Sequence, residues 1–452
     1  MRRPIAFLAS ALTLVLGVVP GCGGSGGDRH GPPVVVLAID GLEWSVLRPM
    51  LTDGRAPNLR RLADRGVAGL LSTDVPTFSP MLWTSVATGA KPRQHGILHF
   101  AETDPATGEM KPGGLPYTSN SRKLPAIWNV CGGNGRSVLS VGWWVSWPAE
   151  PVPGGRIVAS YAAQAQAQVL WKAGVWTDGL EELTFPPALQ DDIAPLLREG
   201  APEGPLQAEF EADFALVPRG AAWPIERMVE RNLRFTFHGD RTHHRIFLSE
   251  LERRVADLNL VYFGVADVAG HFFWRYREPG AYDYAVPEHK VELLGERVEE
   301  VYGVVDRWVG EVLERLPDDA YVLVLSDHGM HAARPDEPRH LSSGGHDDGP
   351  PGIVIAAGPG IRAAGLPAGE PEVLGSIYDV FPTLLTWLAL PVPDDAVGSA
   401  RRGWMEDGWN AAHPPASVAT YAAGFRAATP PRAPGNQANE EFLEGMKALG
   451  YF

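Results

Sequence analysis

The stretch that decides the fold is Tyr321-Val-Leu-Val-Leu-Ser-Asp327-His328-Gly329. It begins with a continuous apolar run, which is typical of a strand covered on both faces by other elements. The run ends abruptly in an acid and a histidine, and both residue types bind metal ions in proteins. We therefore interpret the stretch as a buried strand whose carboxyl end carries two candidate metal ligands.

Two further segments of the chain repeat this pattern. Residues 34–39 form a second apolar run that is followed directly by Asp40. Residues 260–266 form a third run, which is followed by Asp267 and, four residues later, by His271. Ligands of open α/β sheets bind at the edge where the carboxyl ends of the parallel strands meet. The three segments therefore predict one site at that edge.

Apolar runs and helical patterns alternate along the whole chain. The predicted strands cover residues 34–39, 137–145, 259–266, 321–325 and 353–357. The predicted helices cover residues 57–65, 81–89, 245–258, 292–316, 376–390 and 440–450. This alternation predicts an α/β fold, with a doubly wound, mostly parallel sheet and helices on both faces. A Pro-rich segment at roughly 150–245 has a mixed pattern, and we expect it to be an insertion that caps the site.

The N-terminal segment has the composition of an export signal. Two arginines precede an apolar run that ends near Cys22, and residues 23–32 form a Gly/Ser-rich tether. We expect residues 1–22 to be a signal peptide and Cys22 to carry a lipid, as in bacterial lipoproteins. The protein would then be exported to the periplasm or the cell surface, with the lipid as its membrane anchor. An ordinary signal cut near Cys22 is the alternative, and the apolar run is short for a membrane span.

Composition narrows the choice of partners. The chain has 452 residues, and we expect residues 33–400 to form the catalytic domain and residues 401–452 a C-terminal extension. The net charge of −15 argues against binding to nucleic-acid polymers, which requires basic patches. A small phosphorylated substrate stays compatible with this charge, because bound metal ions can dominate locally. If Cys22 is lipidated, Cys131 has no disulfide partner and is expected to be a buried thiol.

Acidic and imidazole side chains follow the predicted strands, and we take six of them as candidate metal ligands. They are Asp40, Asp267, His271, Asp327, His328 and His346. Taken singly, such an Asp is often a helix cap and such a His an ordinary core or surface residue. Their coincidence at strand ends favours a site. A pair of divalent cations that acts on both oxygens of a phosphoryl displacement would need about six ligands of this kind.

Ser79 is the candidate nucleophile. It precedes Pro80, and proline is favoured in the first turn of a helix, so the pattern predicts Ser79 at the N-cap. The N-terminal amides of a helix favour a phosphate, and a nearby metal would activate the hydroxyl. Thr77 is the alternative nucleophile. A serine that only caps the helix is the structural alternative.

The order of these motifs resembles the type I phosphodiesterase/nucleotide pyrophosphatase family of the alkaline phosphatase superfamily. The motifs are Asp40-Gly41, Pro57-Asn58-Leu59, Ser79-Pro80 through Thr88-Gly89, His95-Gly96-Ile97, Asp267 through His271, Asp327-His328-Gly329 and His346. The resemblance covers residues from about 33 to 390. It implies an alkaline-phosphatase-like fold with a capping insertion.

The resemblance also implies a two-metal phosphodiesterase or phosphatase, with zinc as the metal. One zinc ion would be held by Asp267, His271 and His346, and the other by Asp40, Asp327 and His328. A small phosphorylated substrate would be hydrolysed through a covalent intermediate on Ser79, whose spacing to Thr88-Gly89 matches that of the family's nucleophile. Where the nucleotide pyrophosphatases carry an Asn that contacts phosphate, this chain has Leu98-His99-Phe100, so His99 is a candidate substrate-binding residue.

Three alternative functions differ in what they require of the chain. A sulfatase would need a Cys or Ser in a Cys/Ser-x-Pro-x-Arg context, and neither Ser79 nor Cys131 has one. A phosphotransferase that moves a lipid or glycan head group would use the same site, so only its products would differ. A non-catalytic surface lipoprotein of the same fold is the third alternative, although the complete ligand set argues against it.

Overall fold

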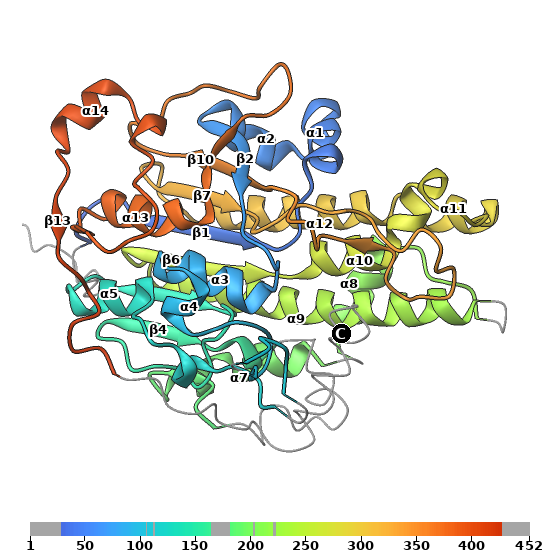
Figure 1. Cartoon of the computed structure of the whole chain (residues 1–452), viewed down its shortest axis with the longest axis horizontal. Coiled ribbons are helices and arrows are strands. Elements are labelled where there is room, and N and C mark those ends of the chain that lie inside the picture. Colours follow the sequence, from blue (N-terminus) through green and yellow to red (C-terminus); the bar gives the residue numbers. More distant parts are fainter. Residues whose placement is uncertain are drawn as a thin grey trace, which may run out of the picture.

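The structure is a computed structural model. It describes residues 29–426 except 105, 112–113, 164–180, 202–203 and 220–222. Within these residues the centre of the molecule is a sheet of nine strands (Figure 1). In spatial order they are β11 (Val373–Ser376), β2 (Val67–Ser72), β10 (Gly352–Ala357), β7 (Tyr321–Leu325), β1 (Val34–Ile39), β6 (Leu258–Phe263), β3 (Val138–Val141), β4 (Gly155–Val158) and β5 (Thr184–Phe185). Two short pairs lie outside this sheet, β8 (His331–Ala332) with β9 (Gly344–Gly345) and β12 (Val392–Pro393) with β13 (Ser417–Val418).

Strand β1 lies in the middle of the sheet, parallel to both β6 and β7. Val34 pairs with Leu258 on one side and with Tyr321 on the other, so the three strands begin level and end level. All three are fully buried, as their continuous apolar sequences predict. Strand β10 runs antiparallel to both of its neighbours, and β5 is antiparallel to β4. The predicted α/β fold with a mostly parallel sheet is confirmed.

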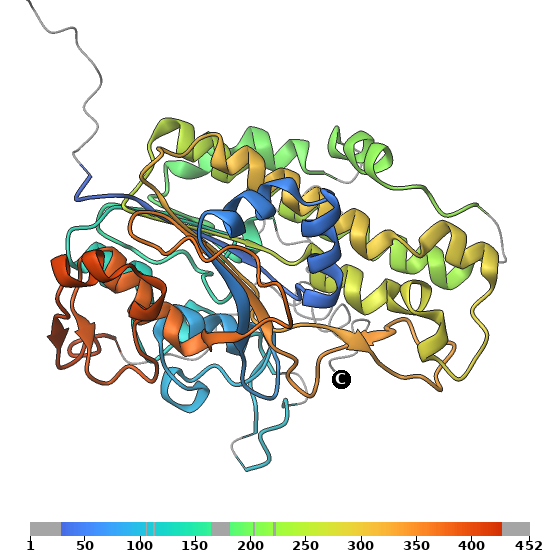
Figure 2. The same cartoon turned by 90° about the horizontal axis from the view of Figure 1, so that it is seen from above.

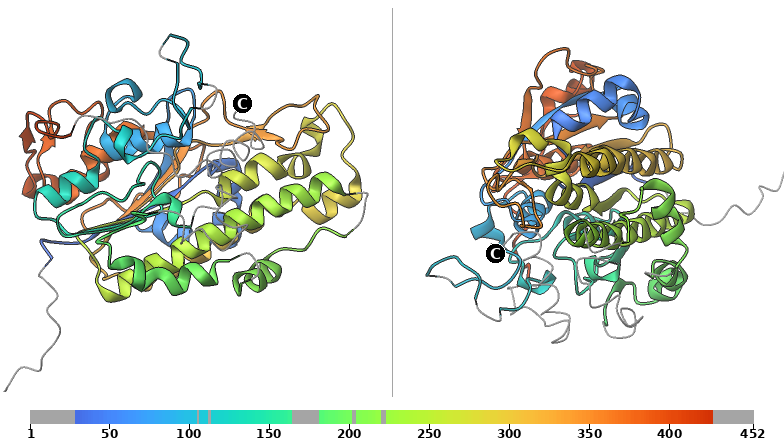
Figure 3. Two further views of the ribbon diagram at one scale, coloured as in Figure 1. Left: turned by 90° about the horizontal axis from the view of Figure 1, so that it is seen from below. Right: turned by 90° about the vertical axis from the view of Figure 1, so that its right-hand side faces the viewer.

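Helices cover both faces of the sheet. They are α1 (Trp44–Asp53), α2 (Pro57–Asp64), α3 (Ser79–Thr88), α4 (Pro92–His95), α5 (Ile127–Gly133), α7 (Leu189–Glu199), α8 (Leu206–Asp213), α9 (Pro224–Arg253), α10 (Val265–Arg277), α11 (Glu288–Leu294), α12 (Arg297–Leu313), α13 (Ile377–Trp387) and α14 (Asp407–Ala412). Seen from above, α1, α2, α9 and α12 lie on one side of the sheet, and α3, α4 and α13 lie on the other (Figure 2). The two views of Figure 3 show the same layering from below and from the right-hand end.

The long helices differ from their predicted bounds. Helix α9 begins at Pro224 instead of residue 245, and proline is favoured at a first helical position. The helix expected over 292–316 is two helices, because α11 ends before Gly295 and α12 begins at Arg297. Helix α13 spans residues 377–387 and keeps Pro382 in its interior. The helix predicted at 440–450 lies outside the described residues.

Two of the predicted strands are shorter than expected. Strand β3 ends at Val141 instead of residue 145, because Gly142 adopts a φ of 72° that turns the chain. Strand β6 ends at Phe263 instead of residue 266. Asp267 therefore lies in the first turn of α10, where it shares a helix face with His271. Val265 and Ala266, at the start of α10, are apolar, so the sequence pattern of the strand continues into the helix.

The described part of the segment predicted as an insertion, 150–245, contains strands β4 and β5 at one edge of the central sheet, together with α7, α8 and most of α9. Helices α7 and α8 pack on α9, and α9 packs on strands β3 and β6. This part of the insertion therefore covers a face of the sheet. Its role as a cap stays a prediction, since residues 164–180 lie outside the described part. The signal segment 1–22 also lies outside it, and among the described helices none is both long and apolar enough to cross a membrane.

Candidate metal centre

The three central strands deliver acidic and imidazole side chains to one edge of the sheet. Asp40 follows β1, Asp327 and His328 follow β7, and β6 leads through Gly264 into α10. The loop after β1 and the start of α10 approach closely, because a Cβ on Gly41 would lie 2.7 Å from the Cα of Asp267. Gly41 also has a φ of 70°, which favours glycine. The predicted common edge therefore brings residues from distant segments into contact.

Asp40, Asp327 and His328 form the first group of candidate ligands. Their ligand atoms all lie within 4.8 Å of one another. The Nε2 atom of His328 is 3.2 Å from Oδ1 of Asp40 and 3.7 Å from Oδ2 of Asp327. All three side chains are fully buried. They are the set that the resemblance assigns to one zinc ion.

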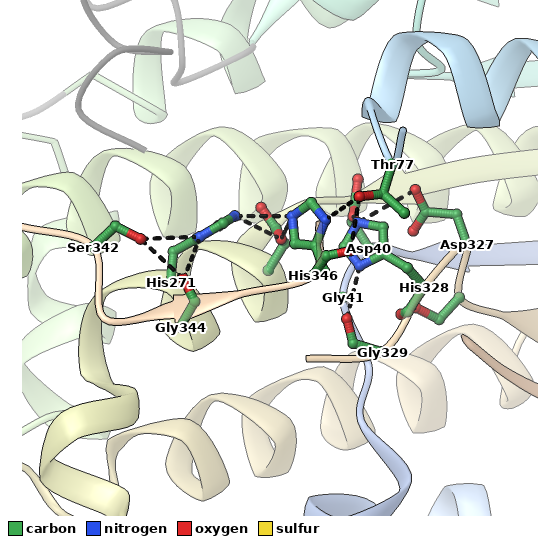
Figure 4. Close-up of polar contacts among 12 residues, drawn as sticks. Asp40, Gly41, Thr77, His271, Asp327, His328, Gly329, Ser342, Gly344 and His346 are labelled. Atoms are coloured by element: carbon green, nitrogen blue, oxygen red, sulfur yellow. Dashed lines mark hydrogen bonds and ion pairs between the residues drawn. The ribbon is translucent and has the colours of Figure 1, made fainter. Parts of the chain in front are cut away.

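His271 and His346 lie side by side (Figure 4), and together with Asp267 they form the second group. Oδ1 of Asp267 is 3.4 Å from Nε2 of His271 and 3.6 Å from Nε2 of His346. The two Nε2 atoms are 3.1 Å apart. The ring of His328 stacks on that of His346, with 3.7 Å between their centroids. The two groups therefore adjoin, and all six predicted ligands converge on one buried centre.

Hydrogen bonds aim the imidazole rings at this centre. Nδ1 of His271 contacts the carbonyl oxygen of Gly344 at 3.0 Å, and Nδ1 of His328 contacts that of Gly329 at 2.9 Å. Each Nδ1–H group thus has a backbone acceptor, which leaves Nε2 as the ligand atom, and such contacts commonly orient metal-binding histidines. The Nε2 atoms are the ones that approach the carboxylates in both groups.

Asp40 is oriented by two aromatic side chains. Its Oδ2 atom accepts hydrogen bonds from the hydroxyl of Tyr262 at 2.6 Å and from Nε1 of Trp83 at 2.9 Å. Its Oδ1 atom faces His328. The sequence interpretation missed both aromatic residues, because each lies within a segment interpreted as apolar packing. No local sequence signal identifies either contact, because both side chains come from segments distant from Asp40 in the chain.

The charges of the centre fit divalent cations. Burial raises the pKa of Asp327, and the neighbouring Asp40 raises it further, well above its ordinary value. Burial lowers the pKa of His328, but Asp327 and Asp40 outweigh burial and raise it to about 10. Neither carboxylate oxygen of Asp327 has a well-formed hydrogen bond within the described residues. Buried acceptors of this kind, beside imidazoles, are what a cation with oxygen and nitrogen ligands requires.

Thr77 lies on the outer side of His346. Its hydroxyl is 2.7 Å from Nδ1 of His346 and 2.9 Å from the carbonyl oxygen of the same residue. Because Nε2 of His346 faces Asp267, Nδ1 is on the opposite side of the ring from the ligand atom. A hydroxyl held in this way can accept the Nδ1–H bond and donate to the carbonyl group. The contact orients His346.

Ser79 lies at the beginning of α3, although the structure differs in detail from the predicted cap. Phe78 occupies the N-cap position, and Ser79 is the first helical residue. Trp83 lies one turn later on the same face of α3 and donates to Asp40. The face of α3 that carries Ser79 is therefore directed toward the first ligand group.

His99 is buried beside the same helix start. Its ring packs on Phe78 with 3.8 Å between the ring centroids, and Nδ1 accepts the backbone N–H of Phe100 at 2.8 Å. Burial lowers the pKa of His99 to about 4, so the ring is neutral at pH 7 and carries its proton on Nε2. His95 instead contacts the hydroxyl of Ser85 at 3.0 Å within the core.

Comparison with known proteins places the chain in a family. Residues 34–357 match the family described as type I phosphodiesterase / nucleotide pyrophosphatase, which is well over half of the chain. No curated protein sequence gives a match.

Three solved structures are among those to which this chain is similar. A phosphonoacetate hydrolase from Sinorhizobium meliloti 1021 is 18% identical, with a TM-score of 0.38 over 67% of this chain and 57% of that one. A putative sulfatase from Bacteroides thetaiotaomicron VPI-5482 is 14% identical, with a TM-score of 0.49 over 83% and 75% of the two chains. Human ectonucleotide pyrophosphatase / phosphodiesterase 5 is 12% identical, with a TM-score of 0.45 over 79% and 95%. The chain spans little more than half the length of the phosphonoacetate hydrolase. The match over residues 34–357 shows that the chain belongs to the type I phosphodiesterase / nucleotide pyrophosphatase family.

Proposed function

We propose that this protein is a zinc-dependent phosphodiesterase or phosphatase that hydrolyses a small phosphoester through a covalent intermediate on Ser79. The observation that carries the proposal is the convergence of three carboxylates and three imidazoles, from segments far apart in the chain, beside the start of α3. The family match supports phosphoester hydrolysis as the reaction class.

The donor set favours zinc. Three imidazole nitrogens and three carboxylates suit a pair of zinc ions better than magnesium or calcium, which prefer oxygen ligands alone. Asp267, His271 and His346 would hold one ion, and Asp40, Asp327 and His328 the other. When bound, such a pair polarises the phosphoryl group and stabilises charge on the attacking and leaving oxygens.

The chain's own residues carry out the bond changes. The Ser79 oxygen attacks phosphorus, so that an Oγ–P bond forms and the P–O bond to the leaving group breaks. The serine proton passes through water to the leaving oxygen, which departs as an alcohol. Water then cleaves the Oγ–P bond, which releases phosphate or a phosphomonoester and regenerates the hydroxyl. Thr77 orients His346, and His99 is proposed to donate its Nε2–H to a phosphate oxygen. Export and lipidation of Cys22 are part of the proposal and are tested by fatty-acid labelling of wild type and Cys22→Ala.

Metal content and turnover together test the function. We expect about two zinc ions per chain and chelator-sensitive hydrolysis of bis-p-nitrophenyl phosphate by the purified protein. Comparison with p-nitrophenyl phosphate separates diesterase from monoesterase activity. A phosphotransferase would consume the donor and place its phosphoryl-linked group on an added acceptor alcohol instead of water. A chain with neither zinc nor turnover would be the non-catalytic alternative, and the proposal would be wrong.

A further inference from the structure

Helix α9 carries a buried carboxyl group close to the candidate metal centre. The side chain of Asp240, near the middle of this helix, is 6% exposed. Its Oδ2 atom accepts the backbone N–H groups of both Gly264 and Val265, each at 2.7 Å. These two residues connect strand β6 to helix α10. The N-cap of α10 is Gly264, which has no side chain to satisfy the first amides, so Asp240 supplies the cap from another helix.

The junction that Asp240 caps, Gly264 and Val265, lies between residues that contact the first ligand group and residues that belong to the second. Before it, the hydroxyl of Tyr262 donates to Asp40 at 2.6 Å, and the carbonyl group of Phe263 accepts the N–H of Asp40 at 2.9 Å. After it, the first turns of α10 carry Asp267 and His271. A shift of the junction would therefore move one ligand group relative to the other.

We propose that Asp240 is a positioning residue of the metal centre, which fixes Asp267 and His271 relative to Asp40 by capping α10 from α9. This inference rests on the proposed metal-dependent function. It gives α9, which begins within the insertion, a role at the site in addition to covering the sheet. Small displacements of ligands matter here, because contacts behind the ligands commonly change metal affinity by about 10–100-fold.

The chain contains a matched control in Asp306. This residue of α12 is 1% exposed, and its carboxylate accepts the N–H of Leu59 at 2.7 Å and that of Asn58 at 3.2 Å. It caps α2, whose own N-cap residue Ala56 has no capping side chain. Helix α2 carries none of the six candidate ligands. Loss of Asp306 should therefore cost stability in the same way without displacing the centre.

The experiment compares Asp240→Ala, Asp240→Asn and Asp306→Ala in the full chain. Zinc affinity is measured by competition with a chromogenic chelator, and the stability of the chelated protein is measured by urea unfolding. We expect both alanine variants to unfold at lower urea concentration. Only Asp240→Ala should weaken zinc binding, by about 10–100-fold. Asp240→Asn should bind zinc nearly as wild type does, because a single oxygen accepts both N–H groups and the amide retains it.

Wild-type zinc affinity in Asp240→Ala would overturn the proposal, and so would an equal loss in Asp306→Ala. If Asp240→Ala does not fold, Asp240→Glu replaces it: the longer side chain should shift the junction and weaken zinc binding, and unchanged affinity would count against the role. A wild-type protein that binds zinc without hydrolysing phosphoesters would refute the proposed function alone, because the comparison of variants still gives its answer. A wild-type protein that binds no zinc overturns both.

Discussion

Substitution of Ser79 and Thr77 separates a nucleophile from a residue that orients a ligand. The two hydroxyls are two positions apart, but Thr77 is engaged with Nδ1 and the carbonyl group of His346, at 2.7 and 2.9 Å. Removing the Thr77 hydroxyl leaves those buried groups unsatisfied, which costs about 1–3 kcal/mol. A factor of ten corresponds to about 1.4 kcal/mol, so zinc affinity should fall roughly 5- to 150-fold in Thr77→Ala. Thr77→Ser keeps the hydroxyl and should restore the affinity.

Ser79→Ala should behave in the opposite way. Loss of a covalent nucleophile lowers kcat by roughly 10⁴- to 10⁶-fold, whereas zinc affinity should stay that of the wild type. The assay is hydrolysis of bis-p-nitrophenyl phosphate at saturating zinc, with the metal content of each variant measured on the same sample. At saturating zinc, Thr77→Ala should recover most of its turnover. The assignment would be refuted if Ser79→Ala kept a tenth of wild-type turnover while zinc-loaded Thr77→Ala had none.

Two further substitutions test the buried charges. Asp327→Asn should lose zinc and turnover together, because a neutral amide replaces an ionised ligand between Asp40 and His328; unchanged metal stoichiometry on elemental analysis would contradict its role. Glu150→Gln should lower the free energy of unfolding by about 3–5 kcal/mol, because the buried Arg122 guanidinium, 2.6 Å from the Glu150 carboxylate, loses its charged partner. Burial raises the pKa of Glu150, but Arg122 outweighs burial and holds the pKa below the ordinary 4.5. The stability that this ion pair contributes is therefore fully present above pH 4.5. It is lost as the pH falls through the lower pKa of the folded state. Urea unfolding between pH 3 and 7 should therefore show a smaller acid-dependent loss in Glu150→Gln than in wild type, and equal losses would argue against the pair.

The central strands could be predicted because their continuous apolar sequences indicate that both faces are buried. Residues 34–39 and 321–325 are apolar throughout, and the structure buries them on both faces. The ends of elements were harder to predict where apolar residues continue from a strand into a helix. Val265 and Ala266 extend the apparent strand of β6, yet Asp240 caps the helix that begins there. Because that carboxylate comes from a distant helix, no local sequence signal marks the boundary.

The candidate ligands were predictable from their places at strand ends, but their orientation was not. Nothing near Asp40 in the sequence indicates that Tyr262 and Trp83 donate to it, since both contacts depend on the packing of separate segments. The role of Thr77 likewise required the structure, because from the sequence Thr77 is only an alternative nucleophile two residues before Ser79. The order of motifs thus predicts the residue types that come together at the centre. Tertiary contacts decide which atom of each side chain faces the centre.

The raised pKa of His328 makes zinc binding a proton exchange. Burial lowers this pKa, but the charges of Asp327 and Asp40 outweigh burial and raise it to about 10. His328 therefore holds an extra proton at pH 7 and must release it before its Nε2 atom can bind a cation. Zinc affinity should increase as the pH rises from 6 to 8, by up to about tenfold per unit for each proton released. Calorimetry in buffers of different ionisation enthalpy would count these protons. An affinity independent of pH, with no proton released, would mean that zinc does not replace a proton on His328.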